Sequence, residues 1–211
     1  MVYPDYFGRI DVLVNNAGIG YFGAIEESDE QEVRKMFEIN FFGLDRLTRE
    51  VLPILRKQKS GFIVNFSSIG GLMSFPSVGY YNATKFAVEG YSEALSKELA
   101  DLGVKVLLVE PGPFRTDWAG RSANESNELI AGYENTSGAT KGSLRGISGN
   151  EPGDPVRAAK AIIAVVEDKN PPLRLLLGAV AFNNAYVKLK ELQTDFDTWK
   201  EVSLGADYPE N

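Results

Sequence analysis

The chain has 211 residues, 44% of them hydrophobic, and its 22 basic and 29 acidic residues give a net charge of −7. This balance, without a run of like charges, argues against a nucleic-acid partner, because proteins that bind nucleic acids present basic surfaces to phosphates. The absence of cysteine and histidine excludes disulfides, thiolate nucleophiles and imidazole bases, and we expect no metal site. Any catalysis must therefore use tyrosine, lysine, serine, asparagine or carboxylates.

The length of the chain suits one domain with one substantial core, and we expect residues 1–211 to form it. No basic stretch followed by an apolar one opens the sequence. No apolar run approaches the roughly 18 residues that would span a bilayer. These patterns predict a cytoplasmic protein with no membrane partner.

Short apolar runs that end in turn residues alternate with amphipathic stretches in the first half of the chain. The runs are typical of buried strands and cover residues 10–14, 62–66 and 104–109. One amphipathic stretch has Ser28 as its predicted N-cap and continues up to Pro53. The other begins near Tyr80 and ends at residues 102–103, where glycine suits a left-handed helix cap. Because parallel strands need crossover connections, this order predicts an α/β fold with helices on both faces of a parallel sheet.

Residues 122–155 are rich in Gly, Ser, Asn and Glu and have no sustained period, so we expect a long loop with at most one short helix. Two interpretations stay open for this region: a mobile substrate lid over about residues 117–152, or a solvated loop. Beyond it the pattern predicts a helix at 155–168, a strand at 173–177 and a terminal helix at 181–192.

The residues suited to chemistry follow the predicted strands. In an open parallel sheet, ligands bind beyond the carboxyl ends of the strands. Tyr81 and Lys85 are four residues apart at the start of a helix, so they share one face. A nearby ammonium favours the phenolate, which would lower the pKa of Tyr81 toward the range useful for a general acid or base. Ser68 could donate a hydrogen bond to a substrate oxygen as that oxygen gains charge.

These residues, together with Asn15-Asn16-Ala17-Gly18 and the Pro111-Gly112 pair that closes the next strand, occur in the order and spacing of one known family. The chain resembles the short-chain dehydrogenases/reductases, in their single-domain branch, from Gly8 through Gly178. The resemblance implies a Rossmann-like, doubly wound parallel sheet. It also implies NADP or NAD as cofactor, with NADP favoured.

Carried over residue by residue, the resemblance implies a catalytic tetrad of Asn40, Ser68, Tyr81 and Lys85, in which Asn40 holds a water. Tyr81 and Lys85 would also contact the cofactor. Further cofactor-binding residues lie in two segments, one beside the adenosine ribose and one lining the nicotinamide: Asn16, Ala17 and Gly18, then Pro111, Gly112, Phe114 and Thr116. Each of these residues, taken singly, could instead be an ordinary cap or turn residue.

The family's fold normally opens with a strand, a glycine-rich turn and a helix N-terminus that receives the cofactor's pyrophosphate. That segment is not found in the sequence, and we expect the sheet to be truncated at this end by roughly 60 residues, or two βαβ units. The leading function is reversible hydride transfer between a nicotinamide cofactor and a carbonyl or secondary alcohol. The alternatives are a catalytically incompetent fragment that cannot hold cofactor tightly and a sugar-nucleotide epimerase.

The expected partner is a small carbonyl or alcohol substrate, and the resemblance suggests a homodimer or homotetramer. Four apolar or aromatic residues in the predicted lid indicate an apolar substrate, or else anchor the lid to the core: Trp118, Leu129, Ile130 and Tyr133.

Overall fold

A computed structural model describes residues 7–208. Its centre is a parallel sheet in the order β1-β3-β4-β6. The strands are β1 (Val12–Asn15), β3 (Gly61–Phe66), β4 (Val104–Pro111) and β6 (Arg174–Leu177). The register pairs Val12 with Phe62, and Gly61 with Val104. The predicted α/β class and parallel sheet are confirmed.

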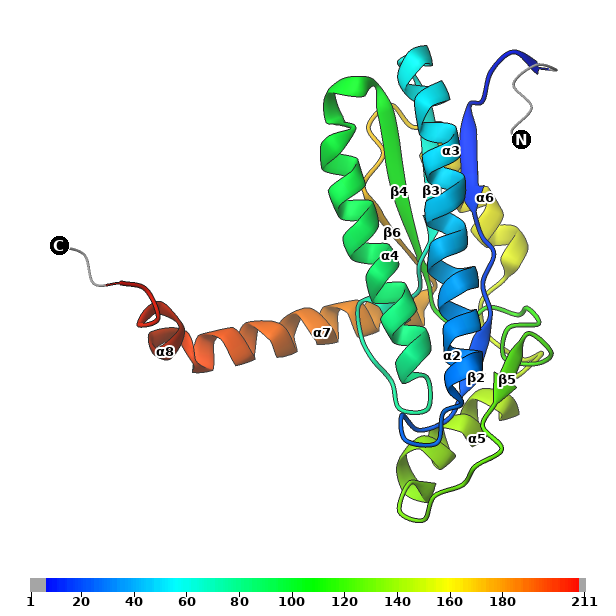
Figure 1. Cartoon of the computed structure of the whole chain (residues 1–211), viewed down its shortest axis with the longest axis vertical. Helices are drawn as coiled ribbons and strands as arrows, with labels where there is room; N and C mark the ends of the chain where they lie inside the picture. The colour runs from blue at the N-terminus through cyan, green and yellow to red at the C-terminus, as the bar shows by residue number, and fades with distance from the viewer. Residues whose placement is uncertain (1–6, 209–211) are drawn as a thin grey trace.

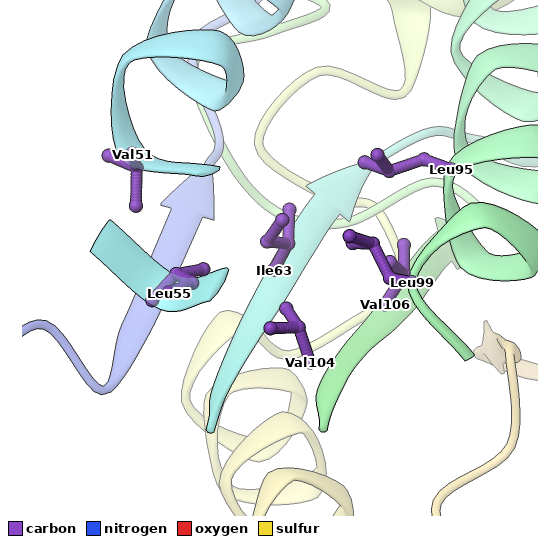
Figure 2. Close-up of a cluster of buried hydrophobic side chains, with 7 residues drawn as sticks. All are labelled: Val51, Leu55, Ile63, Leu95, Leu99, Val104 and Val106. Atoms are coloured by element: carbon purple, nitrogen blue, oxygen red, sulfur yellow. The ribbon is translucent and has the colours of Figure 1, made fainter. Parts of the chain in front are cut away.

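Two helical layers cover the sheet (Figure 1). One face carries α2 (Glu30–Phe37), a π-helical segment η1 (Glu38–Phe42), α3 (Gly43–Gln58) and α4 (Gly79–Glu98), and the other carries α6 (Pro155–Val166). Alternation along the strands explains this arrangement, because successive side chains point to opposite faces. Ile63 packs with α3 and α4, whereas Phe62 and Val64 pack with α6. Figure 2 shows the cluster on the first face: Val51, Leu55, Ile63, Leu95, Leu99, Val104 and Val106.

The first predicted helix differs from the observed one at both ends. Asp29, not Ser28, is the N-cap, and its carboxylate accepts hydrogen bonds from the amides of Gln31 and Glu32. Pro53 lies inside α3, which continues to Gln58. A proline removes one backbone hydrogen bond from a helix. Val51 and Leu55, on either side of Pro53, are buried in the core, and we attribute the continuation of the helix to their packing.

The connection between α4 and β4 follows the prediction. A short 3-10 helix, η3 (Ala100–Leu102), is followed by Gly103 in the left-handed conformation at φ 69°. A Cβ atom at this position would overlap the carbonyl oxygen of Lys59. Glycine is therefore needed here both for its backbone angle and for the close approach of two loops.

The segment predicted as a loop is more ordered than expected. It contains β5 (Ala123–Glu125), a π-helical segment η4 (Glu134–Gly138) and α5 (Ala139–Gly146). β5 pairs in parallel with β2 (Gly20–Phe22), a strand that directly follows the predicted cofactor loop. Short strands with such distant partners have no local periodic signal, which is why the pattern missed them.

The terminal helix is longer than predicted and partly detached. α7 (Ala179–Thr198) begins against the sheet, where Ala181 and Ala185 are buried, and is followed by α8 (Lys200–Leu204). In Figure 1 the second half of α7 projects away from the sheet. None of the helices among residues 7–208 is long and apolar enough to cross a membrane.

Candidate active site

A cavity of about 670 Å³ lies where the carboxyl ends of β3 and β4 meet the start of α4. Its walls come from four parts of the fold: the loops after β1, β3 and β4, the start of α4, the α5 region, and the starts of α6 and α7. Parallel strands bring their carboxyl ends to the same edge of a sheet, which explains why residues far apart in sequence meet here.

Tyr81 and Lys85 are neighbours on the first turns of α4, as predicted. The Lys85 Nζ lies 5.6 Å from the centroid of the Tyr81 ring and donates a hydrogen bond of 2.8 Å to the backbone carbonyl of Phe66. The Lys85 side chain is buried, with 4% of the residue exposed. The Lys85 side chain reaches from α4 to the end of β3 and so joins two elements that line the cavity.

The pKa of Tyr81 is shifted upward, opposite to the predicted direction. Burial raises the pKa of Tyr81 to about 12, and a hydrogen bond with the Ser68 side chain acts against this rise. Burial also lowers the pKa of Lys85 to about 8, while the charge of Glu89 raises it. Trp118 covers the Tyr81 ring at a centroid distance of 4.8 Å. The prediction that Lys85 lowers the pKa of Tyr81 is therefore wrong for this structure, because desolvation dominates both groups.

Ser68 follows β3 and caps the short 3-10 helix η2 (Ile69–Gly71). Its Oγ accepts a hydrogen bond of 3.0 Å from the amide of Gly70. A Cβ atom on Gly70 would lie 2.8 Å from the Asn82 Oδ1 and 3.4 Å from the Tyr81 ring. The absence of a side chain at Gly70 thus lets the Ser68 turn pack closely against the first turn of α4.

Asn40 does not line the cavity but ties its parts together. Its Oδ1 accepts a hydrogen bond of 2.8 Å from the amide of Ile19, and its Nδ2 donates to the Ile19 carbonyl at 3.0 Å and to the Thr84 hydroxyl at 3.1 Å. Thr84 in turn donates to the carbonyl of Tyr81 at 2.8 Å. Asn40 lies in the π-helical segment η1, buried between the loop after β1 and α4.

Most of the predicted cofactor-binding residues line the cavity. Ala17 is the exception and is not part of the lining. The remainder line the cavity: Asn16, Gly18, Tyr81, Lys85, Pro111, Gly112, Phe114 and Thr116. A Cβ atom on Gly18 would lie 3.5 Å from Asn40 Oδ1 and 3.6 Å from Lys85 Nζ, so the backbone of the cofactor loop runs directly past both side chains.

Several lining residues were not predicted as site residues. Glu151 is buried in the segment after α5, Leu144 lies on α5, and Ile147 directly follows that helix. Of the residues proposed as lid contacts, only Trp118 lines the cavity; Leu129 is 78% exposed, and Tyr133 binds Glu26 at the surface. Among residues 7–208, no group of three or more acidic side chains is arranged to hold a metal ion.

The site matches one protein family in both sequence and structure. The model for "short chain dehydrogenase" matches residues 3–127, more than half of the chain. This chain belongs to the short-chain dehydrogenase family. Its relatives are named as oxidoreductases and reductases, so the predicted enzyme class is confirmed.

Similar members of the short-chain dehydrogenase family come from fungi and bacteria. Oxidoreductase BOA17 of Botryotinia fuckeliana is 40% identical over 202 residues, which cover 96% of this chain and 73% of the relative. The 3-ketodihydrosphingosine reductase of Bacteroides thetaiotaomicron is 43% identical over 173 residues, which cover 81% of this chain and 64% of that enzyme. This chain thus spans about two thirds to three quarters of the length of these two relatives.

Solved structures of short-chain dehydrogenases share the fold. A crystal structure from Streptomyces avermitilis has a TM-score of 0.89 and 42% identity, covering 98% of this chain and 74% of that one. Structures with the same fold include complexes with NAD, NADH and NADP. These neighbours therefore hold nicotinamide cofactors, in both phosphorylated and unphosphorylated forms.

Proposed function

We propose that this chain carries out reversible hydride transfer between a nicotinamide cofactor and a carbonyl or secondary alcohol, with Tyr81 as general acid and base. The observation that supports it is the convergence of the Tyr81 phenol, the Ser68 hydroxyl and the Lys85 ammonium at one cavity. In reduction Tyr81 gives its proton to the substrate oxygen, and in oxidation it removes that proton. Ser68 donates a hydrogen bond to the same oxygen.

Lys85 has the hydrogen-bond donors that a cofactor ribose requires. An ammonium has three donors, and the Phe66 carbonyl accepts one of them. The remaining donors can bind the ribose hydroxyls, and Asn16, Gly18, Pro111, Gly112, Phe114 and Thr116 would hold the nucleoside and nicotinamide. The bound nicotinamide supplies or accepts the hydride. We keep NADP as the favoured form of the cofactor. Asn40 acts by fixing the cofactor loop to α4 through Ile19 and Thr84.

The substrate that fits the cavity is apolar around its carbonyl. Aromatic and aliphatic side chains make up most of the wall beyond Tyr81: Phe75, Val78, Phe114, Trp118, Leu144, Ile147 and Ile162. Burial of apolar surface against such a wall supplies binding free energy in proportion to the area covered. The similarity to a 3-ketodihydrosphingosine reductase also favours a 3-keto compound.

The segment over residues 117–152 acts as the lid of this cavity. It contributes Thr140, Leu144 and Ile147 to the wall and is anchored through the pairing of β5 with β2. A lid that excludes water strengthens the hydrogen bonds to the reacting oxygen. Assembly into homodimers or homotetramers stays a prediction.

The experiment compares Tyr81→Phe with Tyr80→Phe, a matched change one residue earlier on α4 at a position that does not line the cavity. Aromatic ketones and long-chain 3-keto compounds are offered with NADPH or NADH, and turnover is followed by nucleotide absorbance. We expect Tyr81→Phe to lower kcat at least about 100-fold, the usual contribution of a positioned acid or base, without a change in cofactor affinity. The Tyr80→Phe protein should keep its turnover.

Two results would overturn this function. Equal turnover of the Tyr81→Phe and unchanged proteins would mean that another group supplies the proton. Cofactor binding weaker than millimolar in a fluorescence titration of the purified chain, with no turnover, would instead support the alternative of a fragment that holds no cofactor.

A further inference from the structure

Two buried carboxylates lie near Lys85 and have no part in the proposed chemistry. Glu89 is one helical turn beyond Lys85 on α4, and Glu110 is the next-to-last residue of β4, immediately before the predicted nicotinamide segment. The exposed fractions are 6% for Glu89 and 0% for Glu110. Burial of two carboxylates is costly unless charges or hydrogen bonds compensate them.

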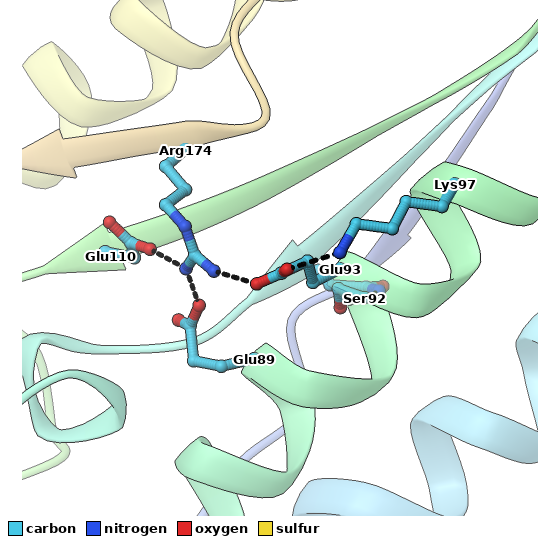
Figure 3. A network of polar contacts seen from close by, with 7 residues as sticks. Glu89, Ser92, Glu93, Lys97, Glu110 and Arg174 are labelled. Atoms are coloured by element: carbon cyan, nitrogen blue, oxygen red, sulfur yellow. Dashed lines mark hydrogen bonds and ion pairs between the residues drawn. The ribbon is translucent and has the colours of Figure 1, made fainter. Parts of the chain in front are cut away.

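One guanidinium brings these carboxylates together. Arg174 is the first residue of β6, and Figure 3 shows its side chain between Glu89, Glu93 and Glu110. Its Nη1 binds a carboxylate oxygen of Glu89 and also Glu110 Oε1 at 2.9 Å, and its Nη2 binds Glu93 Oε2 at 3.1 Å. Because Glu89 and Glu110 meet on the same nitrogen, their charges are only a few ångströms apart.

Burial affects the pKa values of both carboxyls. Burial and the neighbouring charge of Glu89 raise the pKa of Glu110 to about 7, and the hydrogen bond with Arg174 opposes this rise. Burial also raises the pKa of Glu89, and the side chains of Ser67 and Arg174 oppose this rise. The ion pair with Arg174 favours the carboxylate form of Glu89, which is the member of the pair on the same helix as Lys85.

Lys85 has few other sources of negative charge. The groups that face it from the surrounding elements are neutral: the Tyr81 phenol on its own helix, the Phe66 carbonyl of β3 and the Asn40 amide of η1. Among residues 7–208, no carboxylate lies within ion-pair distance of Lys85. Glu93 and Lys97, further along α4, bind each other at 2.7 Å on the surface.

From this geometry we infer that Glu89 is a positioning residue for the reaction: held by Arg174 one helical turn from Lys85, its carboxylate supplies the counter-charge that keeps Lys85 an ammonium inside the fold. The inference rests on the proposed function, since it concerns the charge of a residue that would bind cofactor beside Tyr81. It accounts for a buried charged network that packing alone would not require.

The test is the titration of Lys85 in the purified full chain, read by NMR of ¹³Cε-labelled lysine and assigned by the signal lost in Lys85→Met. Glu89→Gln should lower the midpoint by about one to two pH units, the size expected for a unit charge roughly 6–7 Å away at an effective dielectric constant of about 20. Glu93→Gln is the matched control, because it removes a carboxylate from the same arginine two turns from Lys85. It should leave the Lys85 midpoint within about 0.3 units.

The pH profile of turnover provides the functional measurement. If the ammonium is needed, kcat falls as the pH rises through the Lys85 midpoint, and Glu89→Gln should move this basic limb downward by the same amount as the NMR midpoint. Glu89→Asp should restore part of the shift. An unchanged Lys85 midpoint in a folded Glu89→Gln protein overturns the inference, as does an equal shift in Glu93→Gln. Because the titration needs no turnover, this outcome is distinct from failure of the proposed function.

A second variant covers the case in which Glu89→Gln does not fold. Glu110→Gln keeps the Glu89 carboxylate and should leave the Lys85 midpoint high or raise it. A fall of about one unit in the Lys85 midpoint would overturn the inference.

Discussion

Replacing Lys85 with Met should stabilise the protein at neutral pH while it removes function. The folded-state pKa of Lys85 is about 8, below the ordinary value of 10.5, because burial penalises the ammonium. A lowered lysine pKa means that the charged form costs stability in full below about pH 8, and the cost fades as the pH rises toward 10.5. Methionine has a similar length and flexibility and carries no charge to bury.

The size of this cost follows from proton linkage. A pKa lowered from 10.5 to about 8 corresponds to about 3 kcal/mol of destabilisation at pH 7, falling to about 1.5 kcal/mol at pH 9.5 as the folded protein loses the proton before the unfolded chain does. The change to Met leaves the Phe66 carbonyl without its donor, which costs about 1–3 kcal/mol at any pH. We therefore expect a net gain of about 0–2 kcal/mol at pH 7 and less, or a loss, at pH 9.5.

Urea unfolding of both proteins at pH 7 and pH 9.5 measures this difference, provided that the transitions are reversible and the slopes match. The decisive quantity is how the difference in unfolding free energy changes with pH, since the lost hydrogen bond contributes equally at both values. A difference that stays constant, or that grows in favour of Lys85→Met at high pH, would refute the reasoning that burial of the ammonium dominates.

Two further changes test the scaffold around the site. Gly103→Ala should destabilise the fold by about 2–3 kcal/mol in thermal or urea unfolding, because Ala must adopt φ 69° and its Cβ overlaps the Lys59 carbonyl. Gly90→Ala, at an open position of α4, should instead stabilise the fold by about 0.5–1 kcal/mol. Equal losses of stability in the two variants would contradict the argument. Arg145→Ala should raise KM several-fold with a smaller effect on kcat, because the Arg145 side chain binds three backbone carbonyls of the lid and lies 4.7 Å from the Phe22 ring centroid. Arg121→Ala, an exposed arginine of the same segment, should leave KM unchanged, and a similar rise in both would remove the special role of Arg145.

Much of the fold and part of the site follow from local patterns of residues. The alternation of apolar runs with amphipathic stretches identified the parallel sheet, and the left-handed turn at Gly103 was evident from the residue type. The four-residue spacing of Tyr81 and Lys85 placed them on one face of α4. These features depend on neighbours within one or two turns of the chain, so a window of sequence contains their causes.

Other features depend on segments that meet only after folding. The continuation of α3 through Pro53 depends on its packing in the core, and the pairing of β5 with β2 joins segments about a hundred residues apart. The rise in the pKa of Tyr81 reflects how completely Trp118 and the surrounding loops exclude water, and the lowered pKa of Lys85 also reflects burial inside the fold. Desolvation and long-range contacts are properties of three-dimensional proximity, which no spacing along the chain expresses.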